Sequence, residues 1–286
     1  MSSVGDYAFY GCKELETIMI PKNTAYIGKM AFADCYRLKE AGIPEGMASV
    51  GKRAFSGCEE LGSIKLPDSV EKIGSYAFSE CHSLVSVRLP GKLKTLEEGM
   101  FYRCESLKEV KLPDSLKKIK KKAFRESGIS NIVVPENVNG FYEDKKTDCR
   151  EGVFAWCPNL REITIRSKKL DHLYEGSWNG VEKNTVIKVP KSCLKKYKKL
   201  FKKAGLDKKV KVKAISGGVN SGSAKLHSAV KKAYNKGILL AAAAGNGGKK
   251  NGFTEIKYYK KCSTAEKYSN NASNSKVQEV ISRWKK

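Results

Sequence analysis

Cysteine is the residue type whose spacing in this sequence most clearly suggests chemistry. A thiol can form a disulfide, bind a metal or act as a nucleophile. Nine cysteines occur in the 286 residues, and five of them are 23 residues apart: Cys12, Cys35, Cys58, Cys81 and Cys104. Neither a Cys-x-x-Cys pair nor a Cys/His cluster is present, so we expect no metal and no cofactor.

The regular spacing favours a structural role for these thiols. Equivalent residues on stacked repeats have parallel side chains, which suits a column of buried free thiols better than disulfide geometry. Cys157 holds the same place in a later repeat. A nucleophilic pair of Cys81 with His82 is disfavoured, because adjacent residues rarely face one another, and His82 is expected at the surface.

The cysteines belong to an internal repeat that covers most of the chain. Six phenylalanines share the 23-residue spacing: Phe9, Phe32, Phe55, Phe78, Phe101 and Phe124. Phe154 follows after 30 residues, which indicates an insertion before it. The unit at Phe124 is one residue short and has lost its cysteine.

Each unit predicts one turn of a coil that stacks on its neighbours. The pattern L-x-x-I-x-L-P, as in "LGSIKLP" from Leu61, alternates apolar and polar residues and indicates a short strand that ends at proline. The segment x-A-F-x-x-C-x-x-L has near-helical spacing and closes the coil. Since no unit buries its apolar face alone, the sequence predicts an α/β repeat solenoid with short parallel strands.

The units "IGKMAFADCYRL" and "IGSYAFSECHSL" carry the signature of a known family. Residues 1–212 resemble the BspA-like leucine-rich repeats. The resemblance implies a module that binds a protein or a surface glycan, at the cell surface or secreted. The start of the sequence shows no signal-peptide pattern, so either the protein stays inside the cell or its leader is absent from this sequence.

The two ends of the repeat region differ. Residues 185–205 look like a capping unit, with a strand at 186–189 and a helix that places Leu194, Tyr197 and Phe201 on one face. Membrane binding is the alternative for such a basic amphipathic helix. The first residues, "SSVGDYAF", match the middle of a unit, so we expect an apolar end surface there that favours self-association.

Positive charge is concentrated in the second part of the chain. Residues 1–165 hold 25 Lys and Arg against 23 Asp and Glu, whereas residues 166–286 hold 30 against 7. Such a surface suits a polyanion, although a lysine-rich solvated surface is the alternative. Aromatic residues are not interleaved with these lysines, which argues against a specific nucleic-acid motif. No apolar run has the length of a transmembrane segment.

The outward strand positions predict a candidate binding site. Lys65, Arg88 and Lys111 form one column on successive repeats, about 5 Å apart by strand spacing. Ser86 and Glu109 belong to the column beside it. We expect these residues to contact an acidic partner. The alternative is a charged face that meets only solvent.

The remaining residues depart from the repeat. Residues 213–248 read as a small β-α-β segment, in which 238–244 is a continuous apolar run typical of a buried parallel strand. Residues 249–286 are polar and lysine-rich, and we expect them to be disordered or partly helical.

The stretch "KGILLAAAAGNGG" within this segment resembles part of the subtilisin-like serine peptidases. The resemblance implies that Asn246 matches the position of the oxyanion-hole asparagine. That family needs Asp, His and Ser motifs in chain order, and they are absent from this sequence. We therefore expect no enzyme, and Asn246 has no catalytic role.

Three functions follow from these observations. The first is a non-catalytic leucine-rich repeat module for adhesion or interaction. The second is an inactive fragment of a subtilisin-like peptidase fused to repeats. The third is polyanion binding through the basic C-terminal half, which would weaken steeply with salt.

Overall fold

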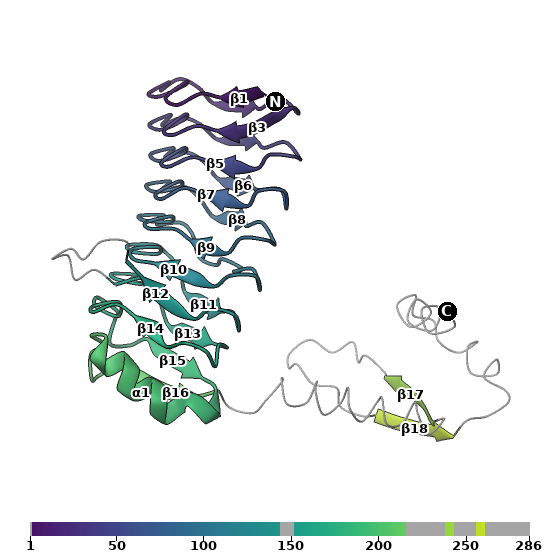
Figure 1. The fold of residues 1–286 in the computed structure, drawn as a ribbon, viewed down its shortest axis with the longest axis vertical. Helices are drawn as coiled ribbons and strands as arrows, with labels where there is room; N and C mark the ends of the chain where they lie inside the picture. The colour runs from purple at the N-terminus through teal and green to yellow at the C-terminus, as the bar shows by residue number, and fades with distance from the viewer. Residues whose placement is uncertain (1, 144–151, 216–237, 243–255, 261–286) are drawn as a thin grey trace. The chain divides into compact units, whose positions relative to one another are not determined.

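The computed structural model describes residues 2–143, 152–215, 238–242 and 256–260. The chain divides into two compact units, Met1–Ile215 and Ser216–Lys286, which are described separately. The first unit is a solenoid of stacked rungs, each contributing short strands (Figure 1).

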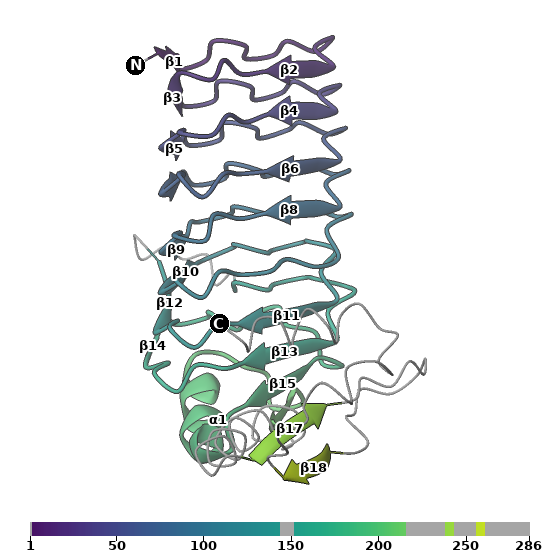
Figure 2. The ribbon, with the colours of Figure 1, turned by 90° about the vertical axis from the view of Figure 1, so that its right-hand side faces the viewer.

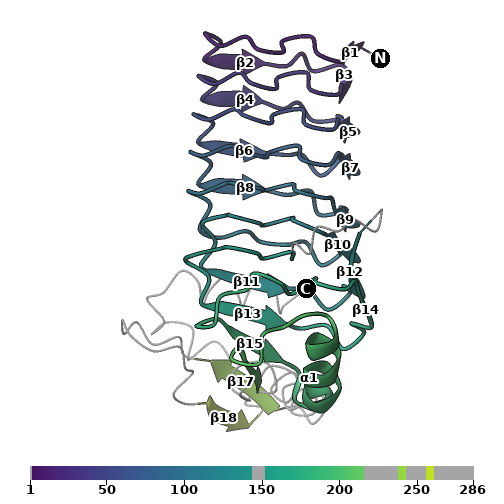
Figure 3. The same cartoon turned by 90° about the vertical axis from the view of Figure 1, so that its left-hand side faces the viewer.

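Two columns of parallel strands lie on opposite sides of the first unit (Figures 2 and 3). One column comprises β2 (Thr17–Met19), β4 (Glu40–Gly42), β6 (Ser63–Lys65), β8 (Ser86–Arg88), β11 (Asn131–Val134), β13 (Glu162–Ile165), β15 (Val186–Val189) and β16 (Lys211–Ala214). The other comprises β1 (Ser2–Val4), β3 (Thr24–Ile27), β5 (Ser49–Val50), β7 (Lys72–Ile73), β9 (Thr95–Leu96), β10 (Lys118–Lys120), β12 (Gly140–Tyr142) and β14 (His172–Leu173). This arrangement confirms the predicted solenoid of short parallel strands.

The strand register follows the sequence period. Lys65 of β6 lies opposite Arg88 of β8, and Val50 of β5 lies opposite Ile73 of β7. In both pairs the partners are equivalent residues of neighbouring repeats. A shift of one residue would turn every buried side chain outward, so burial holds this register.

The core is continuous along the first unit. The phenylalanine rings from Phe9 to Phe154 stack with neighbouring centroids 5.1 to 6.1 Å apart. Inward strand residues such as Ile64 and Leu66 are buried beside them, while Lys65 between them is exposed. Each rung therefore buries its apolar side chains only because the next rung covers them.

The segment that carries the phenylalanine and the cysteine forms turns, and its near-helical spacing does not produce a helix. Two positions in most rungs have a positive φ angle, as at Arg53 (56°) and Gly57 (74°) on either side of Phe55. A right-handed helix cannot pass through such residues. The backbone instead bonds to the next rung, as in the 2.9 Å bond that Phe55 N–H donates to the carbonyl of Ala77. The term α/β therefore overstates the helix content of the repeats.

A helical cap follows the last repeats. The 3₁₀-helix η1 (Lys191–Cys193) leads into α1 (Leu194–Lys203), whose Tyr197 and Phe201 are fully buried. Phe201 packs on the indole of Trp178, with ring centroids 4.7 Å apart. Strand β16 then pairs in parallel with β15, so the repeat sheet extends past residue 212 to Ala214.

The described part of the second unit consists of β17 (Ile238–Ala242) and β18 (Ile256–Lys260). These strands pair antiparallel, with Ile238 opposite Lys260, and this corrects the expectation of a parallel strand at 238–244. An antiparallel pair needs only a loop between its strands, whereas a parallel pair needs a crossover. Strand β18 also lies within 249–286, where we expected disorder or helix. The helix expected between 213 and 248 lies outside the described residues.

Candidate binding surface

The proposed basic column lies on the side of the first unit that carries β2, β4, β6 and β8, which we call the strand face. Strand pairing places Lys65 beside Arg88, and it places Ser63 beside Ser86 in the neighbouring column. Lys111 and Glu109 occupy the same positions one rung further, in a segment that forms no regular strand. All five predicted site residues, Lys65, Arg88, Lys111, Ser86 and Glu109, have exposed side chains.

The central cation of the column is already compensated. The guanidinium of Arg88 donates one hydrogen bond to the carbonyl of Leu66 (3.1 Å) and another to Asp68 Oδ2 (2.9 Å). The backbone N–H of Gly91 and the Arg88 guanidinium lower the pKa of Asp68 below its usual value. Lys65 and Lys111 form no ion pair with any described residue. The column therefore presents two uncompensated ammonium groups on either side of a neutralised arginine.

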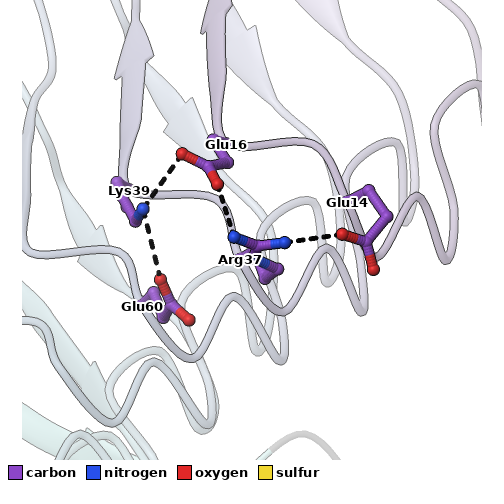
Figure 4. Close-up of polar contacts among 5 residues, drawn as sticks. All are labelled: Glu14, Glu16, Arg37, Lys39 and Glu60. Carbon is purple, nitrogen blue, oxygen red and sulfur yellow. Dashed lines mark hydrogen bonds and ion pairs between the residues drawn. The ribbon is translucent and has the colours of Figure 1, made fainter.

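A network of ion pairs lies beside β2 and β4 on the first rungs (Figure 4). Its contacts are Arg37–Glu14 (2.6 Å), Arg37–Glu16 (2.6 Å), Lys39–Glu16 (3.0 Å) and Lys39–Glu60 (3.9 Å). The hydrogen bond from Lys39 lowers the pKa of Glu16. Sequence reasoning missed this network, although the 23-residue spacing of Glu14, Arg37 and Glu60 was a signal for it. Because these cations are paired with carboxylates, the first rungs have little excess positive charge, and the excess lies on later rungs.

Exposed apolar side chains accompany the charged ones. Val85 precedes β8 and is 56% exposed, and Met19 at an outward position of β2 is 80% exposed. Val133 on β11 is 40% exposed. Large apolar side chains on a rigid strand face supply contact area for a partner, while the lysines supply charge complementarity.

The buried thiols of the cysteine column have the environment of structural residues. The buried thiols each donate to a phenylalanine carbonyl of the preceding rung, as Cys58 does to Phe32 (3.1 Å) and Cys81 to Phe55 (3.1 Å). Burial raises the pKa of Cys35 and Cys157 to about 11. The cysteines of the column are free, as predicted, and five of them are buried, but Cys12 at the first rung is exposed, contrary to the expectation of a fully buried column. A reactive cysteine instead requires a lowered pKa.

Several other predicted features have a defined place in the first unit. His82 is partly exposed, with Nδ1 3.6 Å from Glu105 Oε1. At the first rung, Val4, Phe9 and Ile18 are only partly buried, as expected for an apolar end surface. Self-association through that surface stays a prediction. Asn246 lies outside the described residues.

The cap carries the strongest positive charge of the described chain. Residues 186–215 contain twelve lysines and one acidic residue. Within this range, only Lys188 forms an ion pair with a described residue, Glu162 (2.5 Å). The apolar face of α1 packs on the core through Tyr197 and Phe201, so that face is not available for a membrane.

Two negative observations limit the chemistry of the described residues. Across the described ranges, no three His, Cys, Asp or Glu side chains lie close enough to hold a metal ion. In the same part of the chain, no helix has the length and apolar character needed to cross a membrane.

The fold and the surface together define a leucine-rich repeat solenoid with parallel strands. The family model for the BspA type leucine rich repeat region matches residues 1–47, 31–150 and 143–216. The chain belongs to this family. The match ends at residue 216, so it lends no support to the peptidase resemblance of residues 213–248.

The comparison with solved structures found leucine-rich repeat proteins that are similar to this chain. A leucine-rich cell surface protein from Faecalibacterium prausnitzii is 23% identical, with a TM-score of 0.54 over 75% of this chain and 61% of that one. A leucine-rich repeat protein of T. pallidum is 25% identical, with a TM-score of 0.43 over 73% of this chain and 79% of that one. This chain thus spans less than two thirds of the Faecalibacterium protein. No curated protein matches the chain.

Proposed function

We propose that the solenoid is a non-catalytic module that binds an acidic protein partner through its strand face. The observation that carries the proposal is the pair of uncompensated ammonium groups at Lys65 and Lys111, with the exposed Val85 between them along the chain. Charge complementarity would direct the partner, and the apolar side chain would add contact area.

A location at the cell surface is part of the same proposal. It is supported by membership of the BspA-type family and by the description of the Faecalibacterium structure as a cell surface protein. The raised pKa of the buried thiols Cys35, Cys81 and Cys157 supports a structural role for them, in a module for adhesion or interaction.

Charge reversal tests the binding face. The triple variant Lys65→Glu, Arg88→Glu, Lys111→Glu should lose binding to an immobilised poly-glutamate peptide, measured by surface plasmon resonance at low salt. The matched control is Lys52→Glu, Lys72→Glu, Lys94→Glu, which changes the net charge by the same amount at exposed positions away from the column of Lys65, Arg88 and Lys111, with Lys72 on β7 of the other strand column. Equal loss of binding in both triple variants would show that only net charge matters, and the proposed face would be wrong.

A second function, polyanion binding, is favoured by the lysines of the cap. The helix α1 exposes Lys195, Lys198 and Lys202, and none of them pairs with an acidic residue among those described. A surface of this kind attracts a linear polyanion and releases it as salt rises. Reversal of these three charges should lower the salt concentration at which the chain elutes from a heparin column. Unchanged elution would contradict this function.

A further inference from the structure

A cavity of about 320 Å³ lies beside the end of α1, at the turn of the last rungs. Trp156, Asn179, Glu182 and Asp207 line it, together with the buried Trp178. The residues that line it are all distinct from those of the strand-face column. Its volume is at the lower end of the range for small-molecule sites, which suits a ligand of one ring.

Trp156 is a large aromatic residue at an exposed position of its rung. Its φ angle of 53° is shared by the residues at the equivalent position of the other rungs, which include Gly11, Asp34, Gly57, Glu80, Arg103, Glu126 and Gly180. The left-handed conformation therefore belongs to the repeat. The tryptophan side chain does not, and its indole is 49% exposed, so burial in the core does not explain it.

The indole of Trp156 is held in place. The guanidinium of Arg125 lies over it, 4.5 Å from the ring centroid, and Arg125 Nη2 is 2.9 Å from Glu126 Oε1. Cation–π contact of this kind fixes the ring without covering all of it. A fixed and exposed aromatic ring at the cavity forms a flat apolar platform.

The rest of the cavity is polar. The carboxylates of Glu182 and Asp207 supply hydrogen-bond acceptors, the amide of Asn179 supplies an acceptor and a donor, and the ammonium group of Lys183 supplies donors. In the wall, the indole Nε1 of Trp178 is buried and has no acceptor among the described residues. An apolar platform beside several polar groups matches a ligand with one apolar face and many hydroxyl groups.

We propose that this cavity binds a neutral pyranose ring. The C–H face of the sugar would stack on Trp156, and its hydroxyl groups would donate to Glu182 and Asp207. The two carboxylates outnumber the single ammonium group of Lys183 at the site, and this excess of negative charge disfavours an acidic sugar. The site is independent of the proposed acidic-protein face, so either can be wrong while the other holds.

Saturation-transfer NMR tests the site on the full chain. The probes are the methyl pyranosides of glucose, galactose, mannose and N-acetylglucosamine, each at millimolar concentration. At least one should receive saturation from the protein. The Trp156→Gly variant should weaken that binding by about tenfold or more, because it removes the platform. Since glycine tolerates the left-handed conformation, this variant should stay folded. Trp156→Phe, which keeps an aromatic ring, should retain part of the binding.

Controls separate this site from other surfaces. Tyr10→Ala removes another half-exposed aromatic ring and should leave the transfer unchanged, as should Lys65→Glu with Lys111→Glu. Glu182→Ala provides a second test at an exposed position in case Trp156→Gly loses its fold. The proposal is wrong if no pyranoside receives saturation, or if neither Trp156→Gly nor Glu182→Ala weakens it.

Discussion

At the scale of single residues, the distance to the neighbouring rung determines whether a position can hold a side chain larger than that of glycine. Gly128 lies in the short unit, and a Cβ atom added there would be 1.9 Å from the carbonyl oxygen of Glu105. Gly62 has nothing within 4 Å of the same added atom. Both glycines lack a positive φ angle, so the neighbouring backbone is the main difference between them.

The pair Gly128→Ala and Gly62→Ala tests this difference. Gly128→Ala should lower the free energy of unfolding by about 2 kcal/mol or more, since the backbone of Glu105 must move. Gly62→Ala should change it by no more than about 0.5 kcal/mol. Urea denaturation followed by circular dichroism measures both. A similar loss in the two variants would contradict the assigned contact.

The buried thiols predict a dependence of stability on pH. Burial raises the pKa of Cys157 from 9.0 to about 11 in the folded chain. Between these values the unfolded chain loses the proton and the folded chain keeps it, so stability falls as pH rises from about 9 to 11. Below pH 9 the thiol is neutral in both states and this contribution is constant.

Cys157→Ser isolates this contribution, because serine keeps a donor for the carbonyl of Phe124 but does not titrate. Ser127, at the cysteine position of its unit, already donates to that carbonyl at 2.7 Å. The loss of stability between pH 9 and 11 should be shallower in the variant, by up to about 1.4 kcal/mol per pH unit. Urea midpoints at half-unit steps of pH measure it. Identical slopes in the parent and the variant would show that the Cys157 thiol ionises at the same pH in the folded and the unfolded chain, and the raised pKa would be wrong.

At the scale of elements, the sequence predicted burial better than conformation. The two-residue period of apolar side chains identified the strands, and the helical period identified the buried face of α1. Both periods record which side chains are kept from water. The turn at each phenylalanine was misread as near-helical, since its apolar spacing does not reveal the positive φ of Arg53 or Glu80. These residues are not glycine, so their residue type did not indicate a left-handed conformation.

The candidate site was predictable to the same degree. A constant period was enough to place Lys65 beside Arg88. The bond from Arg88 to Asp68 was not predictable, because it joins a strand residue to a loop residue 20 positions earlier. The exposed Trp156 cavity was missed as well, since it depends on residues from two rungs and from the segment after α1.

The cap helix provides a test at this scale. The hydroxyl of Tyr197 donates to the carbonyl of Ser167 (2.9 Å) and accepts from the backbone N–H of Leu170 (3.0 Å). Tyr197→Phe leaves both buried backbone groups without this partner, so the free energy of unfolding should fall by about 1–3 kcal/mol. Lys198→Ala on the exposed side should change it little. Chemical denaturation of both variants measures the difference, and equal stability of Tyr197→Phe and the parent would contradict the role of this hydroxyl.

At the scale of the whole molecule, the repeats and the cap together account for the described core. The main hydrophobic cluster runs from Ile20 to Val210, and all of its residues belong to the first unit. In a stacked array, stability comes from each rung and its neighbours, so the contribution of distant segments is small. We therefore expect the solenoid of residues 1–215 to contain the interactions that its own folding requires.

A chain shortened to residues 1–215 tests this conclusion. It should unfold at a midpoint temperature within about 2 °C of the full chain, because no residue of the main core cluster is removed. Differential scanning calorimetry measures the midpoint, and the near-ultraviolet signal of Trp156 and Trp178 reports whether the last rungs keep their packing. A chain ending at residue 185 is the matched control, since it lacks α1 and exposes Trp178 and the rings stacked beneath it. That chain should unfold at a clearly lower temperature. If both shortened chains were destabilised alike, residues 216–286 would be part of the stability of the solenoid and the two units would not be independent.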